Sequence, residues 1–115
     1  MESILNTIKK LLGLDAEYTQ FDTDIIVFIN SVFGTLYQLG VGKPFSITSA
    51  EETWSDYLED VSKLEMIKSY MYMKVRLAFD PPTGGLLDAL KEQAAELEWR
   101  INVMVDPKDT FVDEE

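Results

Sequence analysis

Residues 64–82 read LEMIKSYMYMKVRLAFDPP, and the fold expected for the whole chain follows from this stretch. Stepped by about 100° per residue, its apolar residues fall on two adjoining flanks of a helix. One flank holds Leu64, Ile67, Met71, Val75 and Ala78, and the other holds Met66, Tyr70, Met73 and Leu77. Together they form an apolar arc roughly 200° wide, about twice what a surface helix needs. The pattern predicts a buried central helix that ends before Pro81 and Pro82, because proline lacks an N–H and disfavours helical geometry in the preceding residue.

Lys74 is out of place in this apolar arc. A lysine there either extends its ammonium group to water along its apolar stem or pairs with an acid. The acid could belong to the same chain or to another subunit, which makes Lys74 a candidate ion-pair residue.

Helical patterns also precede and follow the central stretch. Apolar residues of 4–12 repeat at helical spacing and Gly13 ends that first helix. A second helix is expected to start with Asp22 or Thr23 as its N-cap and to close at Gly40. A short acidic helix should follow near Thr53, and a last helix should run from Leu86 to about Val105. Its core stripe is expected to consist of Leu86, Leu87, Leu90, Ala94, Leu97, Ile101 and Met104.

The predicted fold class is therefore all-α: a compact bundle of four longer helices and one short helix around a single core. Residues 1–107 form the one helical domain in this interpretation. Residues 108–115, KDTFVDEE, form an acidic C-terminal tail that is mobile or ordered by a partner, with Phe111 and Val112 as candidate docking residues.

Composition narrows the function classes. The 115 residues include no Cys and no His, which removes disulfides, zinc–thiolate sites and Cys nucleophiles, and lowers the prior for an enzyme. No catalytic residue, metal ligand or cofactor is expected. A net charge of −11 argues against a protein that neutralises nucleic-acid phosphates. No apolar run is long enough to span a membrane, and we expect a soluble protein.

Acidic residues gather in residues 51–60, where Glu51, Glu52, Asp56, Glu59 and Asp60 resemble a metal cluster in composition. Such a pattern is more often a run of carboxylates exposed to solvent than a metal site. The segment also lacks calcium-loop spacing with its central glycine, so we predict no metal site.

Two helix faces are candidates for subunit interfaces. Between Ile25 and Leu39 no residue is charged, and the outer face consists of small or neutral residues: Val27, Asn30, Ser31, Gly34, Thr35 and Gln38. The last helix carries a second apolar stripe of Ala95, Trp99 and Val103 outside its core face. Aromatic residues are enriched at interface centres. The competing interpretations are an ordinary neutral face covered by the same chain and, for Trp99, burial under the N-terminal segment.

Four segments of the sequence resemble the head-tail connector (adaptor, DNA-packaging) proteins of tailed bacteriophages and prophages. They are YTQFDTDIIVFINSVFGTLYQLGVG (18–42), TWSDYL (53–58), KSYMYMKVRLAFDPPT (68–83) and ELEWRINVMVDP (96–107). The resemblance covers nearly the whole chain in order, and the FDPP and ELEWRIN strings are its more specific parts.

The resemblance implies a mostly helical structural subunit without catalytic activity. Such subunits assemble as a ring, typically twelve-fold, below the portal protein at the head-tail junction of the virion, after synthesis in the cytoplasm of the bacterial host. The ring would extend the channel through which genomic DNA leaves and would dock the next stopper or tail protein. The alternative from another class is a small acidic regulator or DNA-mimic inhibitor that binds a basic partner as a monomer or dimer.

Overall fold

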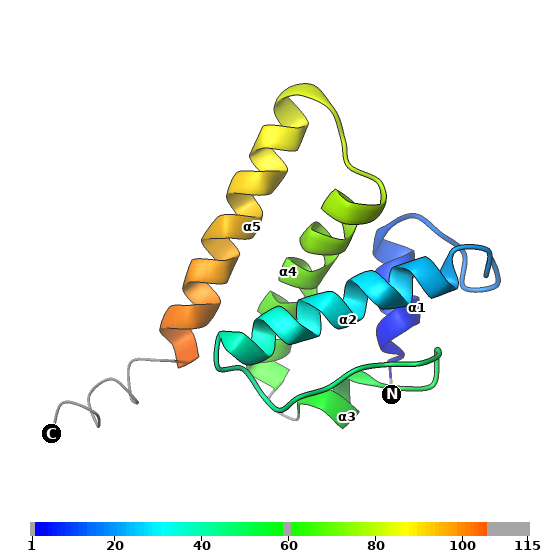
Figure 1. Cartoon of the computed structure of the whole chain (residues 1–115), viewed down its shortest axis with the longest axis horizontal. Helices are drawn as coiled ribbons and strands as arrows, with labels where there is room; N and C mark the ends of the chain where they lie inside the picture. The colour runs from blue at the N-terminus through cyan, green and yellow to red at the C-terminus, as the bar shows by residue number, and fades with distance from the viewer. Residues whose placement is uncertain (1, 59–60, 106–115) are drawn as a thin grey trace, which may run out of the picture.

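The computed structural model describes residues 2–58 and 61–105, and these residues form five helices. The helices are α1 (Ile4–Leu11), α2 (Asp22–Gln38), α3 (Trp54–Tyr57), α4 (Val61–Phe79) and α5 (Gly84–Val105) (Figure 1). The described part of the chain has no strand, only an isolated β-bridge between Ser3 and Thr53. The all-α prediction, with four longer helices and one short one, is confirmed. No helix in the described ranges is long and apolar enough to cross a membrane.

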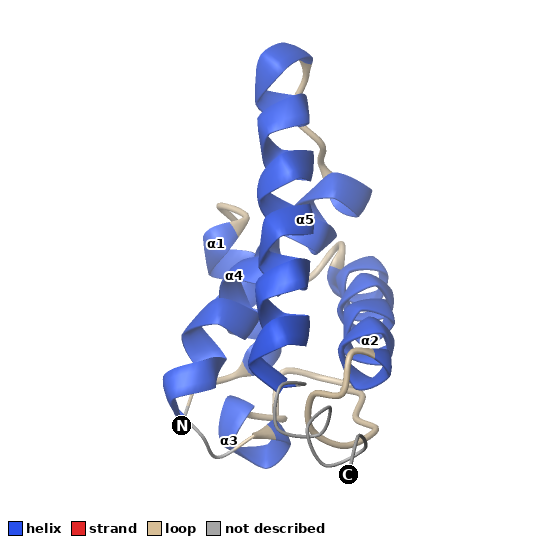
Figure 2. Ribbon diagram, turned by 90° about the vertical axis from the view of Figure 1, so that its left-hand side faces the viewer, coloured by secondary structure: helices blue, strands red, loops and turns tan. Residues whose placement is uncertain are grey.

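Helix α4 is the centre of the arrangement, as the apolar stretch predicts. It packs against α5 on one side and α2 on the other, and α1 contacts both α2 and α4. Figure 2, turned by 90°, shows α5 standing in front of α4 with α2 beside it. Helix α4 ends at Phe79, before the two prolines, and the chain then reverses so that α5 runs antiparallel to α4.

The two apolar flanks of α4 are not equally covered. Leu64, Ile67, Met71 and Val75 on the first flank are buried, whereas Ala78 is exposed. On the second flank only Tyr70 is buried, and Met66, Met73 and Leu77 are half-buried. The described neighbours of α4 therefore cover less of its apolar arc than the sequence predicts.

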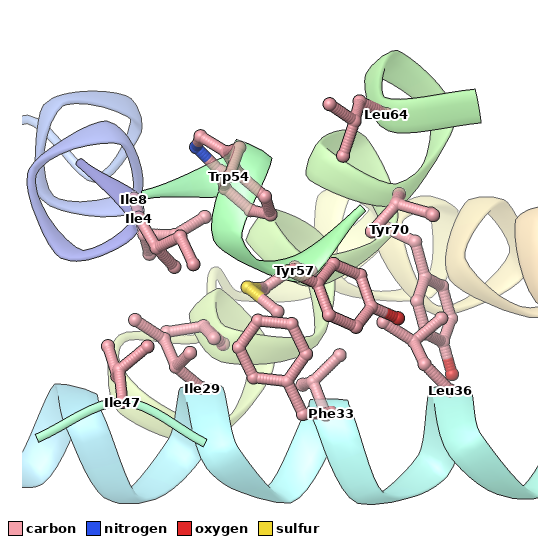
Figure 3. Close-up of a cluster of buried hydrophobic side chains, with 14 of the residues drawn as sticks. Ile4, Ile8, Ile29, Phe33, Leu36, Ile47, Trp54, Tyr57, Leu64 and Tyr70 are labelled. Atoms are coloured by element: carbon pink, nitrogen blue, oxygen red, sulfur yellow. The ribbon is translucent and has the colours of Figure 1, made fainter. Parts of the chain in front are cut away.

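The core is one cluster of buried side chains drawn from all five helices and the connection between α2 and α3. Figure 3 shows Phe33 of α2 facing Tyr57 of α3, with their ring centroids 4.6 Å apart. Phe45 packs edge-on against Phe33 at 5.2 Å. Gly42 has a positive φ of 64°, and a Cβ there would lie 3.2 Å from the Tyr57 ring, so this turn requires glycine.

The start of α2 differs from the prediction. The N-cap is Phe21, which makes no side-chain capping bond, and Asp22 is already the first helical residue. Asp22 is not free to cap because its Oδ1 lies 2.8 Å from the Nζ of buried Lys9 in α1. Its carboxylate also lies in the first turn of α2, where negative charge interacts favourably with the helix dipole.

Helix α5 also departs from the predicted stripe at its first turn. Ala94 and Ile101 are buried, and Leu87, Leu90, Leu97 and Met104 are half-buried, but Leu86 is 58% exposed. Figure 1 gives the reason, since the start of α5 extends past the end of α4 and has no helix to pack against. Glu96 and Arg100 of α5, one turn apart, form an ion pair with 2.6 Å between Oε2 and Nη2.

Candidate assembly surfaces

The outer face of α2 is exposed along its length. Val27 is 59% exposed, and Ser31, Gly34 and Gln38 are exposed as well. No part of the described chain buries this uncharged face, which sets aside the expectation that the chain itself covers it. We call these four residues the α2 face.

Asn30 has a different position from the other candidates on α2. It is half-buried, its Nδ2 donates to the carbonyl oxygen of Ile47 at 3.0 Å, and its Oδ1 accepts from the Ile47 N–H at 2.8 Å. The side chain thus pairs with both backbone groups of Ile47, in the connection between α2 and α3. Its polar atoms are engaged within the chain and are less available to a second subunit than those of Ser31 or Gln38.

The second apolar stripe of α5 is also exposed. Trp99 is 66% exposed, Val103 is 40% exposed, and Ala95 is exposed too. The competing prediction, that the N-terminal segment buries Trp99, is wrong for the part of that segment that the structure describes. We call these three residues the α5 stripe.

A hollow of about 420 Å³ lies beside this stripe. Its lining residues are Leu39, Ala95, Glu98, Trp99 and Asn102. Glu98 accepts a hydrogen bond of 2.8 Å from the hydroxyl of Tyr70 on α4, and burial together with this carboxylate raises the pKa of Tyr70. Leu39, Glu98 and Asn102 were not among the interface candidates that the sequence indicated. The spacing of Glu98 and Asn102 from Ala95, at i+3 and i+7, was the available signal.

Lys74 lies in a second hollow, of about 380 Å³, between α2 and α4. Phe28, Ser31, Val32, Thr35, Leu77 and Ala78 complete its lining. Among the described residues Lys74 makes no ion pair, although it is half-buried. By contrast, buried Lys9 pairs with Asp22, and Lys68 pairs with Glu2 and Glu65. The candidate ion-pair residue therefore has an ammonium group without a carboxylate partner in this part of the chain.

The acidic segment near α3 is used for capping. Glu52 accepts hydrogen bonds from the backbone N–H groups of Thr48 and Ser49, and Asp56 accepts from the N–H of Thr53. Burial would raise the pKa of Glu52, but these hydrogen bonds hold it below the usual range. No three acidic side chains in the described ranges gather as a metal site would require, and Glu59 and Asp60 lie outside those ranges.

The candidate tail residues Phe111 and Val112 also lie outside the described residues. The surfaces that the structure does describe are the uncharged α2 face, the α5 stripe and the two hollows next to them. The α2 face and the α5 stripe offer apolar and neutral contact area, and the hollows add the charged side chains of Lys74 and Glu98. Such surfaces suit protein assembly.

No curated protein and no solved structure matches the chain. A family model described as phage connector protein matches residues 4–108, which include all five helices. That match covers most of the 115 residues and agrees with a helical subunit whose exposed surfaces suit assembly, so the chain belongs to the phage connector protein family, a family of structural proteins of the virus particle.

Proposed function

We propose that this chain is a head-tail connector subunit that forms a ring under the portal protein, twelve-fold in the particle. The ring extends the DNA exit channel and docks the next stopper or tail protein at the head-tail junction. The subunit is made in the bacterial cytoplasm before it joins the virion. Family membership supports a connector role, and the pair of separate exposed surfaces supports the ring.

The observation that carries the ring proposal is the separation of the two surfaces on different helices. A closed ring is built from heterologous contacts, so each subunit must present two different patches that fit each other. We assign these two roles to the α2 face and the α5 stripe, because both are uncharged and exposed. A two-fold dimer would require only one patch that fits itself.

The acidic composition supports the channel role. Proteins that pair with DNA phosphates bind strongly and in a salt-dependent way, and 21 acidic residues against 10 basic ones work against such pairing. A channel wall of this character lets DNA slide without sticking. A ring whose bore is lined by neutral or basic residues, with the acids outside, would contradict this part of the proposal.

Trp99→Glu tests the ring directly. The side chain is 66% exposed, so the variant should keep its fold, while a carboxylate at the centre of the α5 stripe should block assembly. Particle mass measured by light scattering, for the chain alone and with portal rings, reports the assembly. Circular dichroism checks the fold.

Gln93→Glu is the matched control, because Gln93 is exposed on the same helix and the substitution adds the same charge away from the stripe. The control should assemble like the original chain. Rings of unchanged mass and yield with Trp99→Glu would remove the α5 stripe from the interface.

A further inference from the structure

The hollow between α2 and α4 holds a cation that the described chain leaves without a polar partner. We call this hollow of about 380 Å³ the Lys74 hollow. Its walls are apolar except for Lys74 and the hydroxyl groups of Ser31 and Thr35. Among the described residues, the Lys74 ammonium group forms neither an ion pair nor a side-chain hydrogen bond. An occupant of this hollow must therefore be mainly apolar and must also attract a cation.

An aromatic ring satisfies both requirements. The face of an aromatic side chain attracts a nearby ammonium group, and the indole of tryptophan does so most strongly. The chain already uses this contact twice: the Nζ of Lys68 lies 5.5 Å from the ring centroid of Trp54, and the Nζ of Lys43 lies 5.8 Å from that of Phe45. The volume of the Lys74 hollow is at the lower end of the roughly 300–1,000 Å³ of small-molecule pockets, which is enough for one indole group.

Trp99 is such an aromatic side chain, and its own chain leaves most of it uncovered. It is 66% exposed, the highest value among the large apolar side chains that the structure describes. Its indole N–H has no hydrogen-bond partner in the described residues, whereas that of Trp54 donates to Oγ1 of Thr7 at 3.0 Å. Burial of a tryptophan removes about 150–250 Å² from water, and tryptophan is enriched in well-packed pockets at the centres of interfaces.

The positions of Trp99 and of the Lys74 hollow require two copies of the chain for a contact between them. No residue of α5 lines the Lys74 hollow, and in its own chain Trp99 lines the other hollow instead. Ser31 belongs both to the Lys74 hollow and to the α2 face, so a partner seated in the hollow also covers part of that face. The chain thus presents a projecting indole on the α5 stripe and a hollow of matching chemistry beside the α2 face. A contact that repeats from copy to copy needs two such different halves.

We propose that Trp99 of one copy inserts into the Lys74 hollow of the next copy, with the Lys74 ammonium group over the face of the indole. The apolar walls of the hollow then pack against the ring, and the indole N–H donates to the hydroxyl of Ser31 or Thr35. The inference rests on the proposed function, because this contact is the one that repeats around the ring. It gives Lys74 an aromatic partner from a second copy in place of an acid.

Two variants each remove one half of this contact. Lys74→Glu, the hollow variant, keeps Trp99 but places a carboxylate where the negative face of the incoming indole would lie. Trp99→Lys, the indole variant, keeps the hollow but presents a second ammonium group to Lys74. Both Trp99→Lys and the Trp99→Glu of the ring test remove the indole, but only the lysine also repels Lys74.

Each of these two variants alone should associate at least about tenfold more weakly than the original chain. Mixed together, they should form pairs of one copy of each, because the intact hollow of one receives the intact Trp99 of the other. Sedimentation velocity should show these pairs at concentrations where each variant alone is a monomer.

Quenching of tryptophan fluorescence by acrylamide reports the inserted side chain. Trp54 is 3% exposed, so in the hollow variant the quenched emission comes mainly from Trp99, and the indole variant has no tryptophan at that position. An excess of the indole variant added to the hollow variant should reduce the quenching of Trp99 about threefold, because the indole moves from water into a packed pocket.

Two controls separate the hollow from general effects of charge and folding. Lys10→Glu makes the same change of charge as Lys74→Glu, but at an exposed position of α1, and should associate like the original chain. Ala78→Phe fills the hollow from an exposed lining residue without a change of charge, and added to the indole variant it should abolish the protection of Trp99. Circular dichroism checks each fold, and Ala78→Phe replaces Lys74→Glu as the hollow variant if Lys74→Glu does not fold.

The contact is refuted if Trp99 in the mixture stays as open to acrylamide as in the hollow variant alone, or if Ala78→Phe leaves the protection unchanged. The ring is measured separately, as the particle mass of the original chain with portal rings. Rings formed equally well by the hollow variant would refute the contact and leave the ring proposal in place. Protected pairs in the mixture, together with an original chain that forms no ring, would support the contact and refute the ring.

Discussion

Lys9 shows how a single buried charge joins two helices of this small core. The side chain is 1% exposed, its Nζ donates to the carbonyl oxygen of Ala16 at 3.0 Å, and it lies 2.8 Å from Oδ1 of Asp22. The contact with Asp22 is an ion pair. Lys9 thus ties α1 to the linker and to the first turn of α2. The sequence placed Lys9 near the end of α1 but gave no sign of its burial.

Lys9→Met should destabilise the fold. The apolar stem is kept, but Asp22 and the Ala16 carbonyl lose their partner, and Asp22 is 25% exposed so water compensates in part. We expect the free energy of unfolding to fall by about 1 to 3 kcal/mol, measured by urea denaturation. Lys10→Met is the control, because Lys10 is exposed next to it and its loss should stay within about 0.5 kcal/mol. Equal losses would mean that the buried pair adds nothing to stability.

The buried hydroxyl of Tyr57 should make the folding stability depend on pH in the alkaline range. Its hydroxyl is buried without a hydrogen-bond partner in the described residues, and burial raises its pKa from 10.0 to about 12. As pH rises, the Tyr57 hydroxyl therefore loses its proton in the unfolded chain before it does so in the folded chain. The part of the folding stability that depends on this proton is complete below pH 10 and is lost between about pH 10 and 12.

In Tyr57→Phe this part of the alkaline loss should disappear. Between pH 8 and pH 11, the free energy of unfolding should fall by about 1 kcal/mol less in the variant than in the original chain. At pH 8 the variant should be equally stable or more stable, since removing an unpaired buried hydroxyl removes its desolvation cost. Thermal unfolding at several pH values measures both effects, and parallel pH curves for the two proteins would contradict the first.

At the scale of elements, Asn30 determines how the connection after α2 is held. Its amide makes two hydrogen bonds to the backbone of Ile47, which is itself buried in the core. Asn30→Ala should leave both Ile47 backbone groups without this partner and reduce the free energy of unfolding by about 1 to 3 kcal/mol. Amide hydrogen exchange at Ile47 should become faster than in Gln38→Ala, an exposed control on the same helix. Unchanged protection at Ile47 would show that the rest of the core holds this connection.

The helices could be predicted from the sequence because helical periodicity, prolines and glycines are local signals. The end of α4 before Pro81 is of this kind, and so is the end of α1 at Leu11, two residues before Gly13 with its positive φ. What could not be predicted depends on contacts between distant residues. The cap of α2 moved to Phe21 because Asp22 faces Lys9, and Leu86 is exposed because α5 extends past α4.

The same distinction holds for the candidate surfaces. The places of Val27 and Trp99 outside the helix core stripes are a local pattern, and that pattern made them candidates. It left open whether another part of the chain covers them, and the packing of the described helices shows that both are exposed. The hollow at Lys74 was not foreseeable, because it arises where α2 leaves part of the apolar arc of α4 uncovered. The sequence marked Lys74 as unusual, and only the packing of helices shows that it lacks a carboxylate partner among the described residues.

At the scale of the whole molecule, charge opposes the assembly that the exposed surfaces favour. Each copy has a net charge of −11, and several of its few cations are already paired within the chain, as Lys9, Lys68 and Arg100 are. Copies that approach one another in the proposed ring therefore repel at long range, while the α2 face and the α5 stripe, the proposed contact surfaces, are uncharged. Repulsion between exposed charges is screened by salt, and burial of apolar surface is not weakened by it.

The proposed ring should therefore form more readily as the salt concentration rises. Between about 0.02 M and 0.3 M NaCl the screening length shortens from roughly 20 Å to less than 10 Å, so repulsion between neighbouring subunits should decrease. At a fixed protein concentration, sedimentation velocity should show a larger assembled fraction as salt increases. A variant with fewer acids on the exposed surface, Glu51→Gln with Glu92→Gln, should assemble at lower salt and respond less steeply. An equal salt response in both proteins would assign the effect to apolar burial alone. Assembly that weakens with salt would contradict the prediction. It would mean that ion pairs between subunits, and not the uncharged α2 face and α5 stripe, hold the proposed ring together.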